Sequence, residues 1–137
     1  YESGREGFLL GEIDWDTAAI KLLAVRGYVF SAAHKFVSDV TTASGVIANT
    51  SAAFATKTGV AGVADAADVT YTAFTAGAAV PHLILIQSSA VTGGADVAAT
   101  AQRVIAFIDT YTNLPFTPNG GDITVVWDNS ANRIFRL

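Results

Sequence analysis

Short segments in which apolar residues alternate or run together dominate this chain, and they predict strands. Thr17–Arg26 (TAAIKLLAVR) is mostly apolar on both alternating faces, and Leu83–Gln87 (LILIQ) is a continuous apolar run. Both patterns are typical of strands that are covered on both faces of a sheet. Val69–Phe74 and Arg103–Asp109 are rich in β-branched and aromatic residues, which predicts two further strands.

The last quarter of the chain predicts a pair of strands that ends at the final residue. Pro115 and Pro118 fix φ and lack a backbone donor, which excludes their segment from a central strand, and the glycine pair after them predicts a tight turn. Asp122–Asp128 and Arg133–Leu137 flank the polar turn 128–132, and we expect them to form a hairpin. The side chains expected to anchor it in the core are Ile123, Val125, Trp127 and Phe135.

The N-terminus has the pattern of a short helix. Ser3 and Glu6 have the spacing of a capping box, with Ser3 as the N-cap. Gly11 is placed to end the helix, and two glycines inside it weaken its intrinsic stability. We expect Phe8 and Leu9 to face the body of the domain.

The remaining segments carry weaker signals. Ser31–Val40 predicts one or two helical turns that Ser31 caps and whose apolar side chains pack inward. Thr41–Ala67 is rich in small and polar residues, and only Val46–Ile47 and Ala52–Lys57 have weak β character. Ser88–Ala101 is a long connection of a kind that often forms contact arms.

Together these elements predict an all-β fold with a short N-terminal helix. Several short strands separated by turn signals favour a single-domain antiparallel β-sandwich, jelly-roll-like or a partly closed barrel, spanning residues 1–137. A chain of this size buries roughly 65–70% of its unfolded surface, so it holds a core without cross-links. We find no internal repeat that would indicate a solenoid.

Composition removes several classes of function. The chain has no cysteine, which excludes disulfides, thiolate metal sites and a cysteine nucleophile. Its net charge is −4 and its eight basic residues are scattered, so we expect no nucleic-acid partner and no membrane partner. No apolar run approaches the roughly 20 residues of a membrane span, and no signal peptide is visible. Because the chain begins at Tyr1 and has no methionine, we expect its initiating segment to be missing, by processing or by truncation.

Three alternating acids, Glu12, Asp14 and Asp16, are the first candidate site. Carboxylates at a spacing of two fall on one strand face, as a hard-cation site requires. The glycine and distal glutamate of a calcium loop are absent. The simpler interpretation, which we favour, is a solvated start to the first strand, with Trp15 as a buried anchor.

The other acids and the two histidines are weaker candidates. Asp65, Asp68 and Asp96 lie in Ala/Gly-rich segments, where aspartates usually cap turns, and nothing pairs two of them across a cleft. His34 and His82 satisfy one requirement of a hydrolytic triad, but no Gly-x-Ser-x-Gly elbow is present. We expect a surface position for His34 and a strand end for His82. We therefore predict no catalytic, cofactor-binding or metal-binding residues.

The aromatic residues divide into expected core and possible surface. Trp15, Trp127, Phe107 and Phe135 are most simply core residues, and no aromatic residue interleaves with basic residues as an RNA-binding face requires. A carbohydrate-binding module needs exposed aromatic rings. The tyrosines that are reasonable candidates for that role are Tyr28, Tyr71 and Tyr111.

Both ends of the chain resemble a family of small proteins encoded by tailed bacteriophages. The opening GREGFLLGEIDWDTAAIKLLAVR matches a "GR..FL.G.IDW" start, and the ending LPFTPNGGDITVVWDNSANRIFRL matches "NGGDI.V.WDN…I..L". The middle segment GVADAADVTYTAF is also similar. The likeness covers most of the chain and is least secure in 41–58 and 88–101.

This resemblance implies a structural part of a virus particle. The matched motifs are structural, so they carry over no catalytic residue, and we expect a non-enzymatic protein. The leading hypothesis is a capsid decoration or cement protein, assembled in the bacterial cytoplasm as a homo-oligomer and bound to the major capsid protein or other virion proteins. We expect Tyr1–Leu10 and the two long loops, 41–58 and 88–101, to make the contacts with the capsid. A tail, neck or fibre component and a carbohydrate or host-surface binding module are the alternatives.

Overall fold

Antiparallel strands form most of the regular structure in the computed structural model, which describes residues 1–91, 93–131 and 133–137. Two of the segments discussed above, the connection 88–101 and the turn 128–132, each contain one residue outside this description, Thr92 and Asn132. The elements in chain order are α1 (Glu2–Leu9), β1 (Ala19–Arg26), α2 (Val37–Thr42), β2 (Val46–Thr50), β3 (Thr58–Val60), β4 (Val63–Asp65), β5 (Val69–Tyr71), β6 (His82–Ser89), β7 (Arg103–Ile108), β8 (Ile123–Val125) and β9 (Phe135–Arg136).

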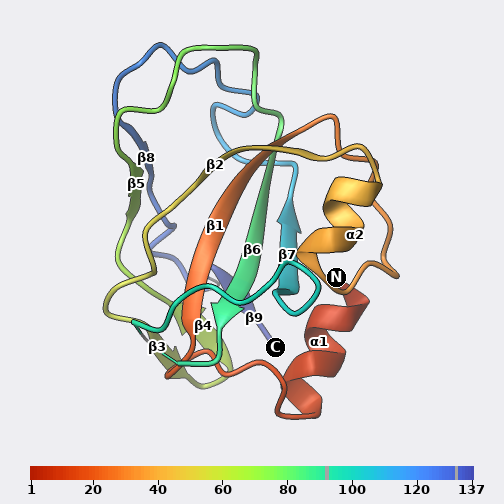
Figure 1. The fold of residues 1–137 in the computed structure, drawn as a ribbon. Coiled ribbons are helices and arrows are strands. Elements are labelled where there is room, and N and C mark those ends of the chain that lie inside the picture. Colours follow the sequence, from red (N-terminus) through yellow and green to blue (C-terminus); the bar gives the residue numbers. More distant parts are fainter. Residues whose placement is uncertain (92, 132) are drawn as a thin grey trace.

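The centre of the molecule is a four-stranded antiparallel sheet in the order β2-β1-β6-β7 (Figure 1). Its two middle strands, β1 and β6, have eight residues each and are almost entirely buried. This confirms the strands predicted at 17–26 and 83–87, since both were apolar on both faces. The predicted strands at 69–74, 103–109 and 122–128 are also confirmed, each shorter than expected.

Different layers cover the two faces of this sheet. On one face, Leu23, Val25 and Ile84 pack against Val37 and Val40 of α2. The other face packs against β4, β5, β8 and their flanking aromatic residues, and α1 lies beside the β7 edge (Figure 1). The side chains that β1 and β6 present to that second layer are Ile20, Leu22, Ala24, Leu83 and Leu85.

The predicted C-terminal hairpin is wrong. β8 pairs with β5, and β9 pairs with β4 in a separate sheet of order β3-β4-β9. The hydroxyls of Thr70 and Thr124 are hydrogen-bonded at 2.8 Å, and the backbone N–H of Trp127 donates to the Asp68 carboxylate at 2.9 Å. Strands from earlier in the chain offer β8 and β9 partners whose pairing buries an apolar face, and that burial decides the pairing.

The architecture is therefore mostly antiparallel strands with a short N-terminal helix, consistent with an all-β fold. The described strands form three sheets, and none of these closes on itself. No helix in the described segments is long and apolar enough to cross a membrane.

α1 confirms the predicted N-terminal helix, but the predicted capping box is wrong. The helix begins at Glu2, so Ser3 lies inside it, and the Ser3 hydroxyl donates to the His34 carbonyl at 2.7 Å. Gly11 follows the helix with φ +71°, the left-handed conformation in which glycine ends helices. Phe8 packs on the core as expected, whereas Leu9 is 88% exposed.

α2 begins at Val37, six residues after the predicted cap Ser31. One oxygen of the Asp39 carboxylate accepts the backbone N–H groups of Lys35 and Phe36, which are otherwise unpaired at a helix start. The acidic side chain in the first turn, and not the earlier serine, therefore sets where this helix starts. The apolar side chains of α2 pack inward as predicted.

The weakly predicted segments give mixed results. β2 confirms the β character at Val46–Ile47, but Ala52–Lys57 forms no strand. That segment is fixed by the buried Phe54 ring, which contacts both tryptophans. The 88–101 connection begins within β6, and its backbone is tied back where the Val97 N–H donates to the Ser88 carbonyl at 2.9 Å.

Candidate functional site

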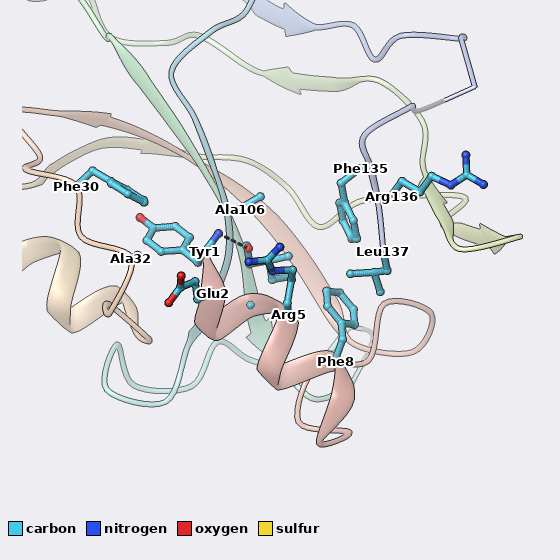
Figure 2. A pocket seen from close by; sticks show the side chains of 12 residues that line it. Tyr1, Glu2, Arg5, Phe8, Phe30, Ala32, Ala106, Phe135, Arg136 and Leu137 are labelled. Carbon is cyan, nitrogen blue, oxygen red and sulfur yellow. Dashed lines mark hydrogen bonds between the residues drawn. The ribbon is translucent and has the colours of Figure 1, made fainter.

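A groove of about 370 Å³ lies between α1, β7 and the C-terminal strand β9, and we call it the α1 groove (Figure 2). Its lining is mainly apolar, with the rings of Phe8 and Phe135 and the side chain of Leu137 on one side. Tyr1 and Phe30 lie at the opposite end (Figure 2). The groove thus brings the two ends of the chain together.

The close approach of α1 to β7 forms the floor of the groove. A side chain on Gly4 would begin 2.3 Å from the Ile105 carbonyl oxygen, so only glycine allows this approach. The amino group of Tyr1 donates to the same carbonyl at 3.5 Å (Figure 2).

Three side chains separate the α1 groove from a second hollow. Phe8, Phe135 and Leu137 also line this neighbouring hollow, which has a volume of about 670 Å³. Phe135 joins the two ends of the chain, because its ring centroid lies 5.6 Å from that of Phe8 and 5.2 Å from that of Trp15. Across this shared wall the two hollows form one larger apolar depression.

Arg5 and Arg136 give the α1 groove an unusual charge in an acidic protein. Both line it, and neither has a carboxylate partner within the described ranges. In Figure 2 the Arg5 guanidinium lies over the floor of the groove, and the Arg136 side chain extends outward from its rim. The basic side chains that do form ion pairs are Lys21 with Asp96, Lys35 with Glu6, Arg103 with Glu12 and Arg133 with Asp65.

The aromatic end of the groove is fixed by a chain of hydrogen bonds. The Tyr1 hydroxyl donates to the Tyr28 hydroxyl at 2.8 Å, which shares a hydrogen bond of 2.7 Å with Nδ1 of His34. Burial and the hydrogen bond to Tyr28 raise the pKa of the Tyr1 hydroxyl. These hydrogen bonds connect the N-terminal residue to Tyr28 and His34.

The three alternating acids do not form a metal site. Glu12 pairs with the buried Arg103, and the Asp14 carboxylate accepts the backbone N–H groups of Asp16 and Thr17. These hydrogen bonds, above all the one from the Thr17 hydroxyl, lower the pKa of Asp14. In residues 1–91, 93–131 and 133–137, no group of three or more histidines and acids is placed to hold a metal ion. The segment is a loop, with Trp15 buried as predicted.

The other candidate acids also have structural partners. Asp65 pairs with Arg133 at 2.6 Å, and the Asp68 carboxylate accepts a hydrogen bond from the backbone N–H of Trp127. The Lys21 ammonium, 2.8 Å from Asp96, lowers the pKa of that carboxyl. The three acids thus serve three separate contacts.

The histidines occupy structural positions as well. His82 begins β6, as predicted, and its ring packs in a tilted arrangement against Phe107, with the ring centroids 5.0 Å apart. Its Nδ1 is buried without a hydrogen-bond partner in the described structure. His34 is half-buried, contrary to the expected surface position, and its Nδ1 contacts a tyrosine and not an acid. This arrangement lacks the carboxylate–histidine contact of a hydrolytic triad.

The three tyrosines that were candidates for carbohydrate binding are mostly buried. Tyr28 and Tyr71 lie in the core, and burial raises the pKa of Tyr71, whose hydroxyl donates to the Leu22 carbonyl at 3.1 Å. Tyr111 is half-buried, and its hydroxyl bonds both backbone groups of Val126. Trp15 and Trp127 are buried as predicted, while Phe107 and Phe135 are half-buried and pack against the core.

The sequence patterns did not predict the α1 groove, because its residues come from both ends of the chain. Phe8 was expected to face inward, and no pattern linked it, or Arg5, to Arg136 and Leu137. A concave, mainly apolar surface that carries the Arg5 and Arg136 side chains is suited to binding. Comparison with known proteins finds no matching family model, no matching curated protein and no matching solved structure.

Proposed function

We propose that this chain is a non-enzymatic structural protein of a tailed-bacteriophage particle, a decoration or cement protein that binds the assembled capsid. One observation carries the proposal beyond the sequence resemblance. Large apolar side chains stay exposed at the ends of the two elements that border the α1 groove: Leu9 is 88%, Leu10 is 64% and Leu137 is 61% exposed. Leu137 lines the groove, and Leu9 and Leu10 stand at the end of the helix that borders it. Exposed large apolar side chains that form a patch favour a protein–protein contact.

A cement protein acts by binding the assembled shell more tightly than its free subunits. Each bound copy then stabilises the assembled state by mass action, with no chemistry required. A groove that is built for contact and contains no catalytic constellation supports such a role. On this proposal the partner is the major capsid protein or another virion protein, the location is the virion, and several copies act together on a symmetric surface.

The finer prediction of a jelly-roll-like sandwich remains part of this proposal. The covering of one face of the central sheet by the β5-β8 and β3-β4-β9 sheets supports it. A tail, neck or fibre component remains the alternative, and the number of copies of this chain per particle distinguishes it from a decoration protein. The carbohydrate-binding alternative is weakened, because two of its three tyrosines are buried.

The test is the copy number of this chain in purified virions of the phage that encodes it. Quantitative mass spectrometry against the major capsid protein gives the ratio, and a particle reconstruction gives the location. We expect a ratio near one copy per capsid protein and density on the outer shell. A few to tens of copies at the tail would support the alternative, and absence from purified particles would overturn the proposal.

A further inference from the structure

We propose that the α1 groove binds an extended, acidic segment of another protein, with a carboxylate on Arg5 and an apolar side chain on the wall formed by Phe8 and Phe135. This inference deepens the proposed function, and it rests on that function only for the kind of protein that supplies the segment. It assigns a docking site and the chemistry of its occupant to a surface that joins the two ends of the chain.

The shape of the two neighbouring hollows favours an extended occupant. The α1 groove and the neighbouring hollow, of about 370 and 670 Å³, lie on the two sides of Phe8, Phe135 and Leu137. A folded partner surface would touch only the rim of such a divided depression. An extended segment places successive side chains alternately, so it can fill one hollow and then the other across the shared wall.

Charge is the second argument, and it gives the segment a direction. Neither Arg5, whose guanidinium lies over the floor of the α1 groove, nor Arg136 at its rim has a carboxylate partner in the described structure. Glu2 also lines the groove, but its carboxylate lies beside Tyr1, away from the Arg5 guanidinium (Figure 2). Guanidinium groups bind carboxylates with two parallel hydrogen bonds, which makes an acidic side chain the matching ligand.

The second hollow takes the apolar end of the segment. Asp14, Asp16 and Lys57 are its charged side chains, so it carries no positive excess, and the buried ring of Trp15 contributes an apolar surface. A carboxylate is therefore favoured near Arg5 and disfavoured beyond Phe135. The segment that fits therefore has an acidic residue next to large apolar residues. The acidic residue sets the orientation of the segment, because it is favoured in the α1 groove and disfavoured in the second hollow.

The chain itself is a poorer occupant than another protein. Each copy has a net charge of −4, so two copies repel each other at long range. A two-fold contact through α1 would also bring Arg5 of both copies toward the same axis. Occupation by a second copy is nonetheless a distinct outcome that the experiment separates.

The test uses the full chain and three fluorescent decapeptides in a fluorescence anisotropy titration. One alternates leucine and aspartate, one leucine and lysine, and one serine and aspartate. We expect binding of the leucine–aspartate peptide alone. Arg5→Gln should weaken that binding about fivefold to tenfold, as loss of a partly exposed charge pair does, and Arg136→Gln should weaken it less. Arg26→Gln is the matched control, since Arg26 also has no carboxylate partner among the described residues but lies outside the groove.

Several results would overturn the inference. These are equal binding of the leucine–lysine peptide, no binding of the leucine–aspartate peptide, or an equal effect of Arg5→Gln and Arg26→Gln in variants whose circular dichroism is unchanged. Concentration-dependent dimers that Arg5→Gln abolishes, seen by sedimentation velocity, would also overturn it and assign the groove to a second copy. If the chain is absent from virions yet binds the peptide, only the proposed function fails. If Arg5→Gln chains still decorate particles normally, only this inference fails.

Discussion

At the scale of single residues, the side chains that fix local structure in this protein do so through contacts distant in sequence. Gly4 intrinsically weakens α1, yet it lets the helix backbone approach β7. Ser3 has the composition of an N-cap but bonds the His34 carbonyl. Asp39 determines the start of α2 by accepting two backbone N–H groups. The roles of Ser3 and Asp39 follow from the groups that their side chains contact. The role of Gly4 follows from the close approach that the absence of a side chain allows.

Gly4→Ala tests the close approach of α1 to the sheet. Alanine favours a helix by about 1 kcal/mol over glycine, so helix propensity alone predicts stabilisation. The added methyl group would lie 2.3 Å from the Ile105 carbonyl oxygen, and we expect a net loss of about 2 kcal/mol from this overpacking. Urea denaturation measures it, with Gly59→Ala as the control, since the nearest atom to a new methyl group there is 3.9 Å away. A more stable Gly4→Ala protein would show that α1 does not dock this closely.

Asp39→Ala tests the cap of α2 and gives a pH dependence. The backbone N–H groups of Lys35 and Phe36 lower the pKa of Asp39 in the folded state, so the unfolded state binds the proton more readily. The stabilisation is complete above the unfolded pKa of about 3.9 and is lost as the pH falls through the lower folded pKa. We expect Asp39→Ala to cost about 1 kcal/mol at neutral pH and less in acid. Denaturation across this pH range measures it, and a constant difference would contradict the cap.

At the scale of elements, the last two strands pair with strands from much earlier in the chain and not with each other. β8 and β9 are separated by a turn that suits a hairpin, but β8 joins β5 and β9 joins β4. Val69 and Val125 are buried partners across the first pair, and the second pair places Phe135 against Trp15. Pairing in these short ribbons therefore follows side-chain burial against the central sheet, because two or three backbone hydrogen bonds alone stabilise little.

A disulfide cross-link tests the β5–β8 pairing in a chain that has no natural cysteine. Thr70 and Thr124 are exposed and directly opposite in the register. Cβ atoms of opposite residues lie roughly 4.5–5.5 Å apart, near the separation that a disulfide needs. We expect Thr70→Cys with Thr124→Cys to cross-link on mild oxidation, seen as a shift on a non-reducing gel after proteolysis between them. The pair Thr124→Cys with Leu137→Cys, which the hairpin would place opposite each other, should stay reduced, and the reverse result would restore the hairpin.

At the scale of the whole molecule, Arg103 connects the layers. It starts β7, its buried guanidinium pairs with Glu12 in the loop before β1, and it lies 5.5 Å from the centre of the Phe36 ring at the start of α2. Its Nε has no hydrogen-bond partner in the described part of the chain, so the contact with Glu12 is the main compensation for burying the charge. One side chain thus ties the loop after α1 and the start of α2 to the edge of the central sheet.

Glu12→Gln tests that connection. The Arg103 side chain is 9% exposed and the Glu12 side chain 51%, so we expect the loss to lie between those of surface and buried pairs, at about 1–2 kcal/mol. Glu6→Gln removes the same charge from a pair in which both partners are about half exposed, and should cost about 0.5 kcal/mol or less. Thermal unfolding of both variants at equal ionic strength gives the comparison. Equal losses would mean that burial of Arg103 does not depend on Glu12.

The apolar patterning predicted much of the fold and little of the candidate site. Runs such as LILIQ located the buried strands, because burial on both faces leaves a direct record in local composition. The pattern misplaced the ends of α2, because contacts of the Asp39 carboxylate decide where this helix starts. It also indicated a strand at 52–57 that does not form, because the buried Phe54 side chain fixes that segment. The α1 groove leaves no local signal, because its residues come from 1–8, from 30–32, from 105–106 and from 135–137.

By itself, therefore, the sequence determined that this chain forms antiparallel sheets around two buried strands with a helix at its N-terminus. That information is local: hydrophobic period and turn residues act within a few positions. Only the tertiary structure decided which strands pair, why Gly4 is needed, and that Arg5 and Arg136 share one groove with Phe8 and Phe135. Those outcomes depend on which surfaces bury each other after the chain folds, and burial is a property of the whole packed molecule and not of any segment.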